Sequence, residues 1–146
     1  MSDLPYTKDV LRLATEASGA GRLPPPCGSH TELNPTCGDR CTVDLRLEGD
    51  VIAAFAHDTK ACVLTQASAS ILGNSLPSHT VADLVQLRVV VQQMLAGGTP
   101  PKGAFARFTH LAEVARHPAR HRCVFLPIDA ALKAASAATE PGSQGA

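Results

Sequence analysis

Three cysteines and one aspartate carry the side chains of this sequence that are best suited to chemistry. Cys37 lies in the turn-like stretch "NPTCGD", and Asp39 follows it by two residues; Cys62 and Cys123 come 25 and then 61 residues further along. Three thiolates and one carboxylate make a four-ligand set for zinc or for an iron–sulfur cluster. Because an oxygen ligand is harder than a fourth thiolate, we expect such a site to exchange its metal readily.

The same residues also allow simpler interpretations. A free cysteine is often a buried core residue, and an aspartate after a glycine, as in Gly38-Asp39, often only completes a turn. The sequence holds no CxxC pair, so spacing alone leaves a metal site, a nucleophile and a tight turn open. A Cys–His hydrolase is disfavoured, because no oxyanion-hole glycine motif accompanies any of the cysteines.

A predicted β-hairpin brings two of these cysteines together. Apolar and polar residues alternate from Cys41 to Glu48, as in a half-buried strand, and Val51 to His57 forms a second apolar run after a short glycine-containing connection. Since a hairpin returns to its own start, Cys37 before it and Cys62 after it should be neighbours. The stretch "SHTEL" before the hairpin can add a third, edge strand.

Helical patterns surround the hairpin. They predict a short amphipathic helix within residues 6–17, a helix that starts near Cys62, and a longer one over residues 81–96 that is capped by Thr80 and Asp83. A last helix is predicted just after Cys123. The N-terminus of a helix lowers the pKa of a nearby thiol, so Cys62 and Cys123 are both placed to form thiolates.

Together these elements predict an α+β domain in which a small antiparallel sheet of two or three strands packs against several helices. The chain of 146 residues is long enough for one compact domain, assigned to residues 1–138. The last residues, 139–146, read "TEPGSQGA" from Thr139 and are predicted to be a disordered tail.

Composition narrows the classes of function. Lys plus Arg and Asp plus Glu both total 13, so no basic surplus indicates a nucleic-acid partner. No segment is long and apolar enough to span a membrane, and the N-terminal stretch lacks the apolar core of a secretory signal. We therefore expect a cytoplasmic protein without membrane contacts, whose five cysteines stay reduced and serve metal binding, reactivity or packing.

Three motifs carry a resemblance to a known family. "NPTCGD", "KACVLTQASAS" from Lys60 and "HPARHRCVFLP" from His117 occur in order around the predicted hairpin. Together they resemble the NifU N-terminal/IscU/SufU family of iron–sulfur cluster assembly proteins, over residues from about Tyr6 to about Ala135. By position, the family's three cysteines and its aspartate correspond to Cys37, Asp39, Cys62 and Cys123.

The resemblance implies a non-enzymatic scaffold. On such a protein, iron and the sulfide from a cysteine desulfurase are assembled into a transient cluster, expected to be of the 2Fe–2S type, which is then passed to recipient apoproteins. The alternative that the resemblance implies is a SufU-type sulfur acceptor for a SufS-like desulfurase. In that alternative Zn²⁺ organises the ligands, and Cys123 or Cys62 carries the persulfide.

The details of the motifs are closest to the SufU branch. The long interval between Cys62 and Cys123 resembles the insertion that marks that branch. In the IscU branch a histidine directly precedes the third cysteine and a Leu-Pro-Pro-Val-Lys segment for a dedicated chaperone lies just before it. Here Arg122 precedes Cys123 and "TPPKG" lies well upstream, which argues against an IscU-type chaperone as a partner.

The remaining candidates have two interpretations each. Cys41 shares its strand parity with apolar neighbours, so it is predicted to be a core residue, and Cys27 is predicted to be a loop thiol. His57 and His121 flank the expected site, where either can donate to a thiolate or replace Asp39, although solvated histidines are commoner. The basic residues Lys60, Arg120 and Arg122 either offset the charge of the ligands or form an ordinary basic surface.

Overall fold

The computed structural model describes residues 6–25, 27–35 and 38–139 and has the predicted α+β architecture. The elements follow one another in the order α1 (Lys8–Glu16), β1 (Gly28–Asn34), β2 (Asp39–Glu48), β3 (Val51–Lys60), α2 (Val63–Ser75), α3 (Val81–Leu95), the 3₁₀ segments η1 (Gly103–Arg116) and η2 (Pro118–Arg120), and α4 (His121–Thr139). The sheet comes first and most of the helices follow it, as expected from the sequence.

The sheet is antiparallel, with the strand order β1-β2-β3. The predicted hairpin is confirmed: β2 and β3 pair along their length, with Cys41 opposite Thr59, and Gly49 supplies the positive φ of 66° that the tight turn needs. The predicted edge strand is also confirmed, because β1 pairs with β2 and places Glu32 opposite Cys41.

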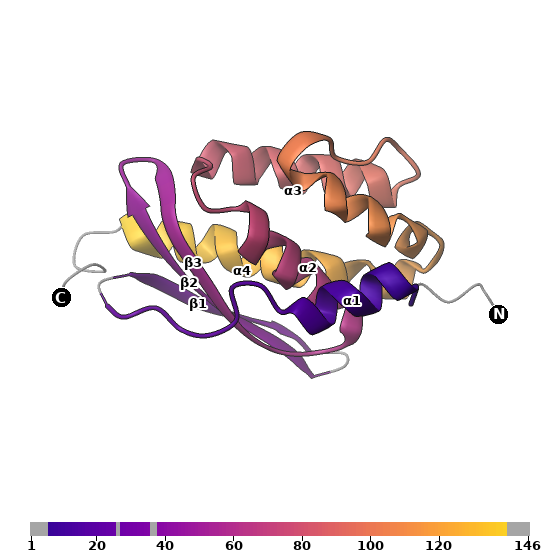
Figure 1. The fold of residues 1–146 in the computed structure, drawn as a ribbon, viewed down its shortest axis with the longest axis horizontal. Helices are drawn as coiled ribbons and strands as arrows, with labels where there is room; N and C mark the ends of the chain where they lie inside the picture. Colours follow the sequence, from indigo (N-terminus) through magenta and orange to yellow (C-terminus); the bar gives the residue numbers. More distant parts are fainter. Residues whose placement is uncertain (1–5, 26, 36–37, 140–146) are drawn as a thin grey trace.

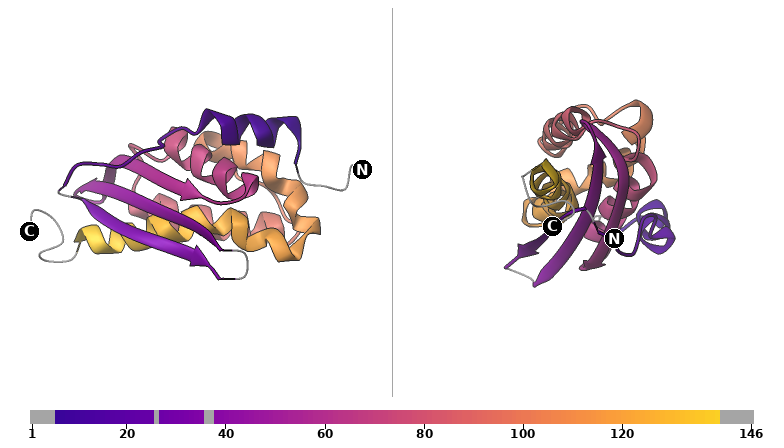
Figure 2. Two further views of the ribbon diagram at one scale, coloured as in Figure 1. Left: turned by 90° about the horizontal axis from the view of Figure 1, so that it is seen from below. Right: turned by 90° about the vertical axis from the view of Figure 1, so that its left-hand side faces the viewer.

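The helices form layers on one face of the sheet. α4 lies along β1 and β2, and α2 packs beside α4 (Figure 1). α3 and η1 pack on the side of this helical layer away from the sheet, whereas α1 packs against α2 (Figures 1 and 2). α2 and α4 are therefore the two helices sandwiched in the middle of the molecule.

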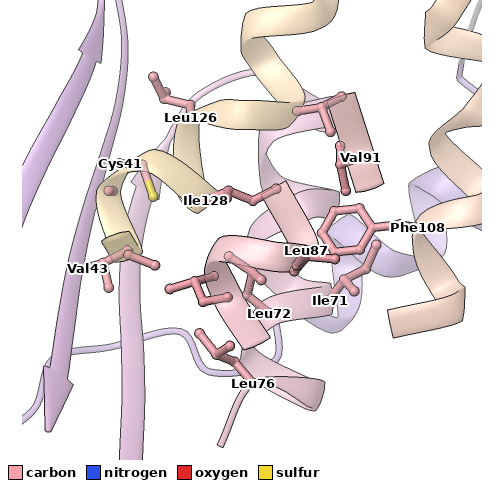
Figure 3. Packing of buried hydrophobic residues seen from close by; sticks show 14 of the residues in the cluster. Cys41, Val43, Ile71, Leu72, Leu76, Leu87, Val91, Phe108, Leu126 and Ile128 are labelled. Atoms are coloured by element: carbon pink, nitrogen blue, oxygen red, sulfur yellow. The ribbon is translucent and has the colours of Figure 1, made fainter. Parts of the chain in front are cut away.

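Aliphatic side chains fill the space between the sheet and the helices, as the low aromatic content predicts (Figure 3). Cys41 and Val43 contribute from β2, Ile71 and Leu72 from α2, and Ile128 from α4; all are fully buried. The predicted core role of Cys41 is confirmed, and its side chain points toward α4 (Figure 3).

The helix boundaries agree with the predictions, with one correction. Thr80 and Asp83 form the predicted capping box of α3. The helix predicted to start just after Cys123 in fact starts at His121, so Cys123 lies in its first turn. The prediction was wrong because Pro127 reads as a residue of a helix start, whereas here it lies inside α4, four residues after Cys123.

Two further predictions concern the ends of the chain and membranes. Thr139 is the last residue of α4, and the rest of the predicted disordered tail lies outside the described residues. Among the helices of the described ranges, none combines the length and the apolar character needed to cross a bilayer.

Candidate metal centre

Three of the four predicted ligands meet at one end of the sheet. The ligand atoms of Asp39, Cys62 and Cys123 all lie within 4.8 Å of one another. They come from three elements: the first residue of β2, the N-cap of α2 and the first turn of α4. The fourth predicted ligand, Cys37, lies outside the described residues, two positions before Asp39.

Strand register brings Asp39 to the start of α2. Arg40 pairs with Lys60 at the end of the β2–β3 ladder, so the residue before Arg40 lies beside the chain that leaves β3. The backbone N–H of Cys62 donates to Oδ2 of Asp39 over 3.4 Å. This is a long contact for a charged acceptor, and it leaves most of the hydrogen-bonding capacity of the carboxylate unused.

α2 and α4 are tied together beside the thiols. The side chain of Ser68, one turn beyond the start of α2, donates from Oγ to the backbone oxygen of Val124 over 2.7 Å, and this contact is buried. Pro127 has no N–H to offer to the backbone oxygen of Cys123, so the turn that carries Cys123 lacks one of its own helical hydrogen bonds. The contact from Ser68 therefore anchors this turn to α2.

The two thiols divide their protons unequally. The pKa of Cys62 is lowered to about 6, mainly because the Cys123 thiol donates to it, and the N–H and hydroxyl of Thr65 add to this effect against burial and the charge of Asp39. The pKa of Cys123 is raised, because its proton is held between the two sulfurs and because the residue is buried. The metal-free pair thus holds one thiolate, at Cys62, and one thiol.

This donor set fits a single metal ion or one corner of a cluster. In a tetrahedral zinc site with sulfur at about 2.3 Å from the metal, two sulfurs are about 3.8 Å apart. The three ligand atoms, at most 4.8 Å apart, need to contract only slightly to reach that geometry. Two sulfurs and one carboxylate oxygen leave room for one further ligand, as the predicted four-ligand set requires.

Two other cysteines do not join the cluster. Cys41 is 0 % exposed, and its sulfur lies 3.3 Å from Oγ1 of Thr59. Burial raises the pKa of Cys41 to about 11, so it stays a protonated core thiol. Cys27 is half-buried just before β1, where burial raises the pKa of its thiol too. This agrees with its predicted place in a loop.

The two flanking histidines, His57 and His121, also make their contacts outside the thiol cluster. The buried His57 faces Thr59 Oγ1 through Nδ1 at 2.8 Å and the backbone oxygen of Ser18 through Nε2 at 3.0 Å. It is neither solvated nor a member of the thiol cluster. His121 Nε2 lies 3.3 Å from the backbone oxygen of Ala115, so its described contact is likewise away from the thiols.

One of the three candidate basic residues is coupled to the cluster. The pKa of Arg120 is raised by Tyr6 and by the charges of Cys123 and Cys62, so its guanidinium lies in the field of the thiols. Lys60 and Arg122 are exposed close to the ligands in sequence. The positive charge of Arg120 is therefore placed to offset the negative charge of the ligand set.

Two buried polar residues of α2 that lie beside the ligands were not predicted from the sequence. Thr65 and Ser68 are both buried on the face of α2 that meets the start of α4. Their spacing of three residues within "CVLTQAS" places them on one face of a helix that starts at a candidate ligand. Polar residues on the inward face of a predicted helix would have indicated that these two side chains have buried hydrogen-bond partners.

Comparisons with known proteins show the family to which this chain belongs. The family model described as "NifU-like N terminal domain" matches residues 5–123. The iron–sulfur cluster assembly scaffold protein IscU of Thermotoga maritima is 26% identical over 121 residues, which cover 83% of this chain and 85% of the relative. The zinc-dependent sulfurtransferase SufU of Bacillus subtilis is 26% identical over 94 residues, 64% of each chain.

Solved structures give the same picture. A nitrogen-fixing NifU-like protein (N-terminal) from Brucella abortus superposes with a TM-score of 0.89 at 31% identity, covering 94% of this chain and 96% of the other. A putative iron–sulfur cluster assembly scaffold protein for the SUF system from Fervidobacterium islandicum superposes with a TM-score of 0.80 over 89% of this chain and 96% of the other. At 18% identity, that second likeness supports the fold alone.

Proposed function

Because the chain belongs to the NifU-like N-terminal domain family of iron–sulfur cluster assembly proteins, we propose that it is a scaffold that holds a nascent cluster through Cys37, Asp39, Cys62 and Cys123. The observation that carries this proposal is the convergence of Asp39, Cys62 and Cys123, whose ligand atoms lie within 4.8 Å of one another. Together with Cys37 they complete the four ligands expected of such a site.

In this proposal each residue has a separate task. The thiolates of Cys62 and Cys123 hold iron at the ends of two helices that Ser68 fixes relative to each other. Asp39 is the exchangeable ligand, because it is an oxygen donor and, among the described residues, its side chain accepts one long hydrogen bond. The cluster is cargo: it is assembled from iron and sulfide and released to an apoprotein when a ligand of the recipient replaces Asp39.

The proposed partners follow from that cargo. Sulfur must be supplied by an enzyme that removes it from an organic donor, and for this family we propose a cysteine desulfurase of the SufS type, together with a two-electron reductant that converts the persulfide sulfur to sulfide. Recipient apoproteins take the finished cluster. No reaction is assigned to the scaffold itself, which contributes binding and exchange.

A zinc-dependent sulfur acceptor is the second candidate function, favoured by the state of Cys62. That thiol is only half-buried, and its pKa is lowered to about 6, whereas Cys123 is 3 % exposed with its pKa raised. In this alternative Zn²⁺ is held by the same ligand set. Of the two predicted carriers, the contrast favours Cys62 over Cys123.

The sulfur transfer would be a thiol exchange at constant oxidation level. The thiolate of Cys62 attacks the terminal sulfur of the persulfide on the desulfurase, and a new S–S bond forms on Cys62. The S–S bond of the desulfurase breaks, and its cysteine leaves as a thiolate. No external oxidant or reductant is needed.

Metal and acid-labile sulfide analysis of the protein purified without oxygen tests these functions, together with its visible spectrum. The scaffold predicts iron and sulfide in near-equal amounts, with a cluster spectrum that is lost in Cys37→Ala, Cys62→Ala and Cys123→Ala. Cys27→Ala is the matched control, because this half-buried thiol lies outside the cluster and its loss should leave the spectrum unchanged.

The possible outcomes separate the candidates. Stoichiometric zinc without sulfide would refute the simple scaffold and support the sulfur acceptor. If the three cysteine substitutions left the metal content unchanged, the assignment of the site itself would be wrong.

A further inference from the structure

One buried hydroxyl faces the two thiols from inside the protein. The side chain of Thr65 is 0 % exposed, and its Oγ1 lies 3.6 Å from the sulfur of Cys62. The same hydroxyl also acts on Cys123, whose thiolate form it stabilises. Thr65 is therefore a neighbour of both sulfurs and is itself shielded from solvent.

The position of Thr65 follows from the start of α2. Cys62 is the N-cap of this helix, and Thr65 is three residues later, so the two side chains lie on the same face. A buried hydroxyl must find a hydrogen-bond partner, since leaving it unpaired destabilises the fold. At this position the partner in reach is sulfur.

Deprotonation of the sulfur fixes the direction of this hydrogen bond. A neutral thiol can donate or accept, and the geometry of the Thr65–Cys62 pair by itself allows either atom to be the donor. A thiolate bound to a metal has lost its proton and can only accept. The hydroxyl of Thr65 must then donate to sulfur, and it draws electron density away from the metal–sulfur bond.

We propose that Thr65 is a positioning residue that donates a hydrogen bond to the metal-bound sulfur of Cys62 and thereby weakens the donation from this sulfur to the metal. The inference rests on the proposed function only in that Cys62 must bind a metal. It assigns to Thr65 a role in how tightly the site keeps its cargo, because hydrogen bonds to ligand sulfurs tune both the affinity and the reduction potential of a centre.

The test uses Co²⁺ added to the metal-free, full-length protein without oxygen, because sulfur-to-cobalt charge-transfer absorption reports directly on the thiolate. Thr65→Val keeps the shape of the side chain and removes the hydroxyl, whereas Thr65→Ser keeps the hydroxyl. Ser70→Ala is the matched control: it removes a buried hydroxyl from the same helix whose partner is the backbone N–H of Ser18.

We expect the charge-transfer band of Thr65→Val to move to longer wavelength, because the sulfur becomes more electron-rich. The affinity for Co²⁺, measured by competition with a chelator, should rise by up to about tenfold, because the sulfur without this hydrogen bond donates more strongly to the metal. Thr65→Ser and Ser70→Ala should both keep the wild-type spectrum. A purely structural role for Thr65 would change stability but not the position of the band.

Two results would overturn the proposal. A wild-type spectrum in a folded Thr65→Val protein shows that the hydroxyl does not act on the bound sulfur; should the valine variant not fold, Thr65→Ala gives the same comparison. If the wild-type protein binds Co²⁺ without any sulfur charge-transfer band, Cys62 is not a ligand, and the proposed function fails together with this inference. A band in the wild-type protein that Thr65→Val leaves unmoved refutes the inference alone.

Discussion

Strand β2 carries two aspartates five residues apart, and their surroundings are opposite. Asp44, in the middle of the strand, is 2 % exposed and accepts from Arg22 Nε at 2.6 Å, from Ser29 Oγ at 2.7 Å and from the Leu23 N–H at 3.0 Å. Asp39, at the end of the strand, accepts one bond of 3.4 Å from the Cys62 N–H.

The cysteines repeat this contrast. Cys41 lies only two residues from Asp39 but is fully buried under the helices beside Thr59, whereas Cys62 is half-buried at the end of the sheet and faces a second thiol. Asp44 and Cys41 are buried groups with partners in the fold, and Asp39 and Cys62 are groups that still have capacity to bind. The difference separates residues that stabilise the fold from residues that are free to take a ligand.

The largest expected difference is in thiol reactivity. At pH 7 in the metal-free protein, iodoacetamide should modify Cys62 more than about a thousandfold faster than Cys41, because the pKa values of about 6 and about 11 give very different thiolate fractions and because Cys41 is buried. Peptide mapping by mass spectrometry after timed quenching measures both rates. Comparable rates would mean that the two cysteines are not in different environments.

The next largest effect concerns the aspartates and metal. Asp39→Ala should weaken the binding of Co²⁺ by about 10- to 100-fold, because it removes a candidate ligand, whereas Asp44→Ala should leave the affinity within about twofold of wild type. A chelator competition assay on both variants makes the comparison. Equal losses in the two variants would show that Asp39 has no special place in the site.

The same two substitutions should affect the stability of the fold in the opposite order, with the larger loss in Asp44→Ala. Asp44→Ala should lower the free energy of unfolding by about 2 kcal/mol, because it leaves the hydroxyl of Ser29 and the N–H of Leu23 without their acceptor; Arg22 is largely exposed and adds little. Asp39→Ala should change it by less than about 0.5 kcal/mol. Urea unfolding in the presence of a chelator measures both. A larger loss in Asp39→Ala would reverse the assignment of the two residues.

The smallest expected effect is on the pH dependence of stability. The pKa of Asp44 is lowered in the folded protein, where the hydrogen bonds from Arg22, Ser29 and Leu23 and the charge of Arg22 outweigh desolvation. The stabilising contribution is therefore fully present above the unfolded pKa of about 3.9 and is lost as the pH falls through the lower, folded value.

Urea unfolding of wild type and Asp44→Asn at pH 5 and pH 3 checks this sign. The difference in free energy of unfolding between wild type and Asp44→Asn should be smaller at pH 3 than at pH 5. The expected decrease lies between a few tenths of a kcal/mol and about 1 kcal/mol. A difference that grows on acidification would contradict the lowered pKa.

Local patterns were enough to predict the hairpin, the edge strand and the burial of Cys41. Alternation with period two fixes which side of β2 faces the helices, and the same argument placed the ends of the hairpin, and hence Asp39 and Cys62, close together. The capping box at Thr80 was predictable for the same reason, since it depends on residues three positions apart.

Long-range contacts were beyond such patterns. The partner of Asp44 is Arg22, which lies in the segment between α1 and β1, and nothing in the spacing of the two residues links them. The burial of His57 depends on Ser18, from that same part of the chain, which supplies a backbone oxygen. The early start of α4 was missed because Pro127 argues against a helix locally, and packing against the sheet and α2 overrides that preference.

The hydrogen bond from Ser68 to Val124 joins two helices that are separated by a long stretch of chain. Residues 76–120, which include α3 and η1, leave from the end of α2 and return at the start of α4. Because the two helices are joined directly beside the thiols, the separation of Cys62 and Cys123 does not depend on how long that excursion is. Changes in the length of the loops within residues 76–120 should therefore leave the distance between the two sulfurs unchanged.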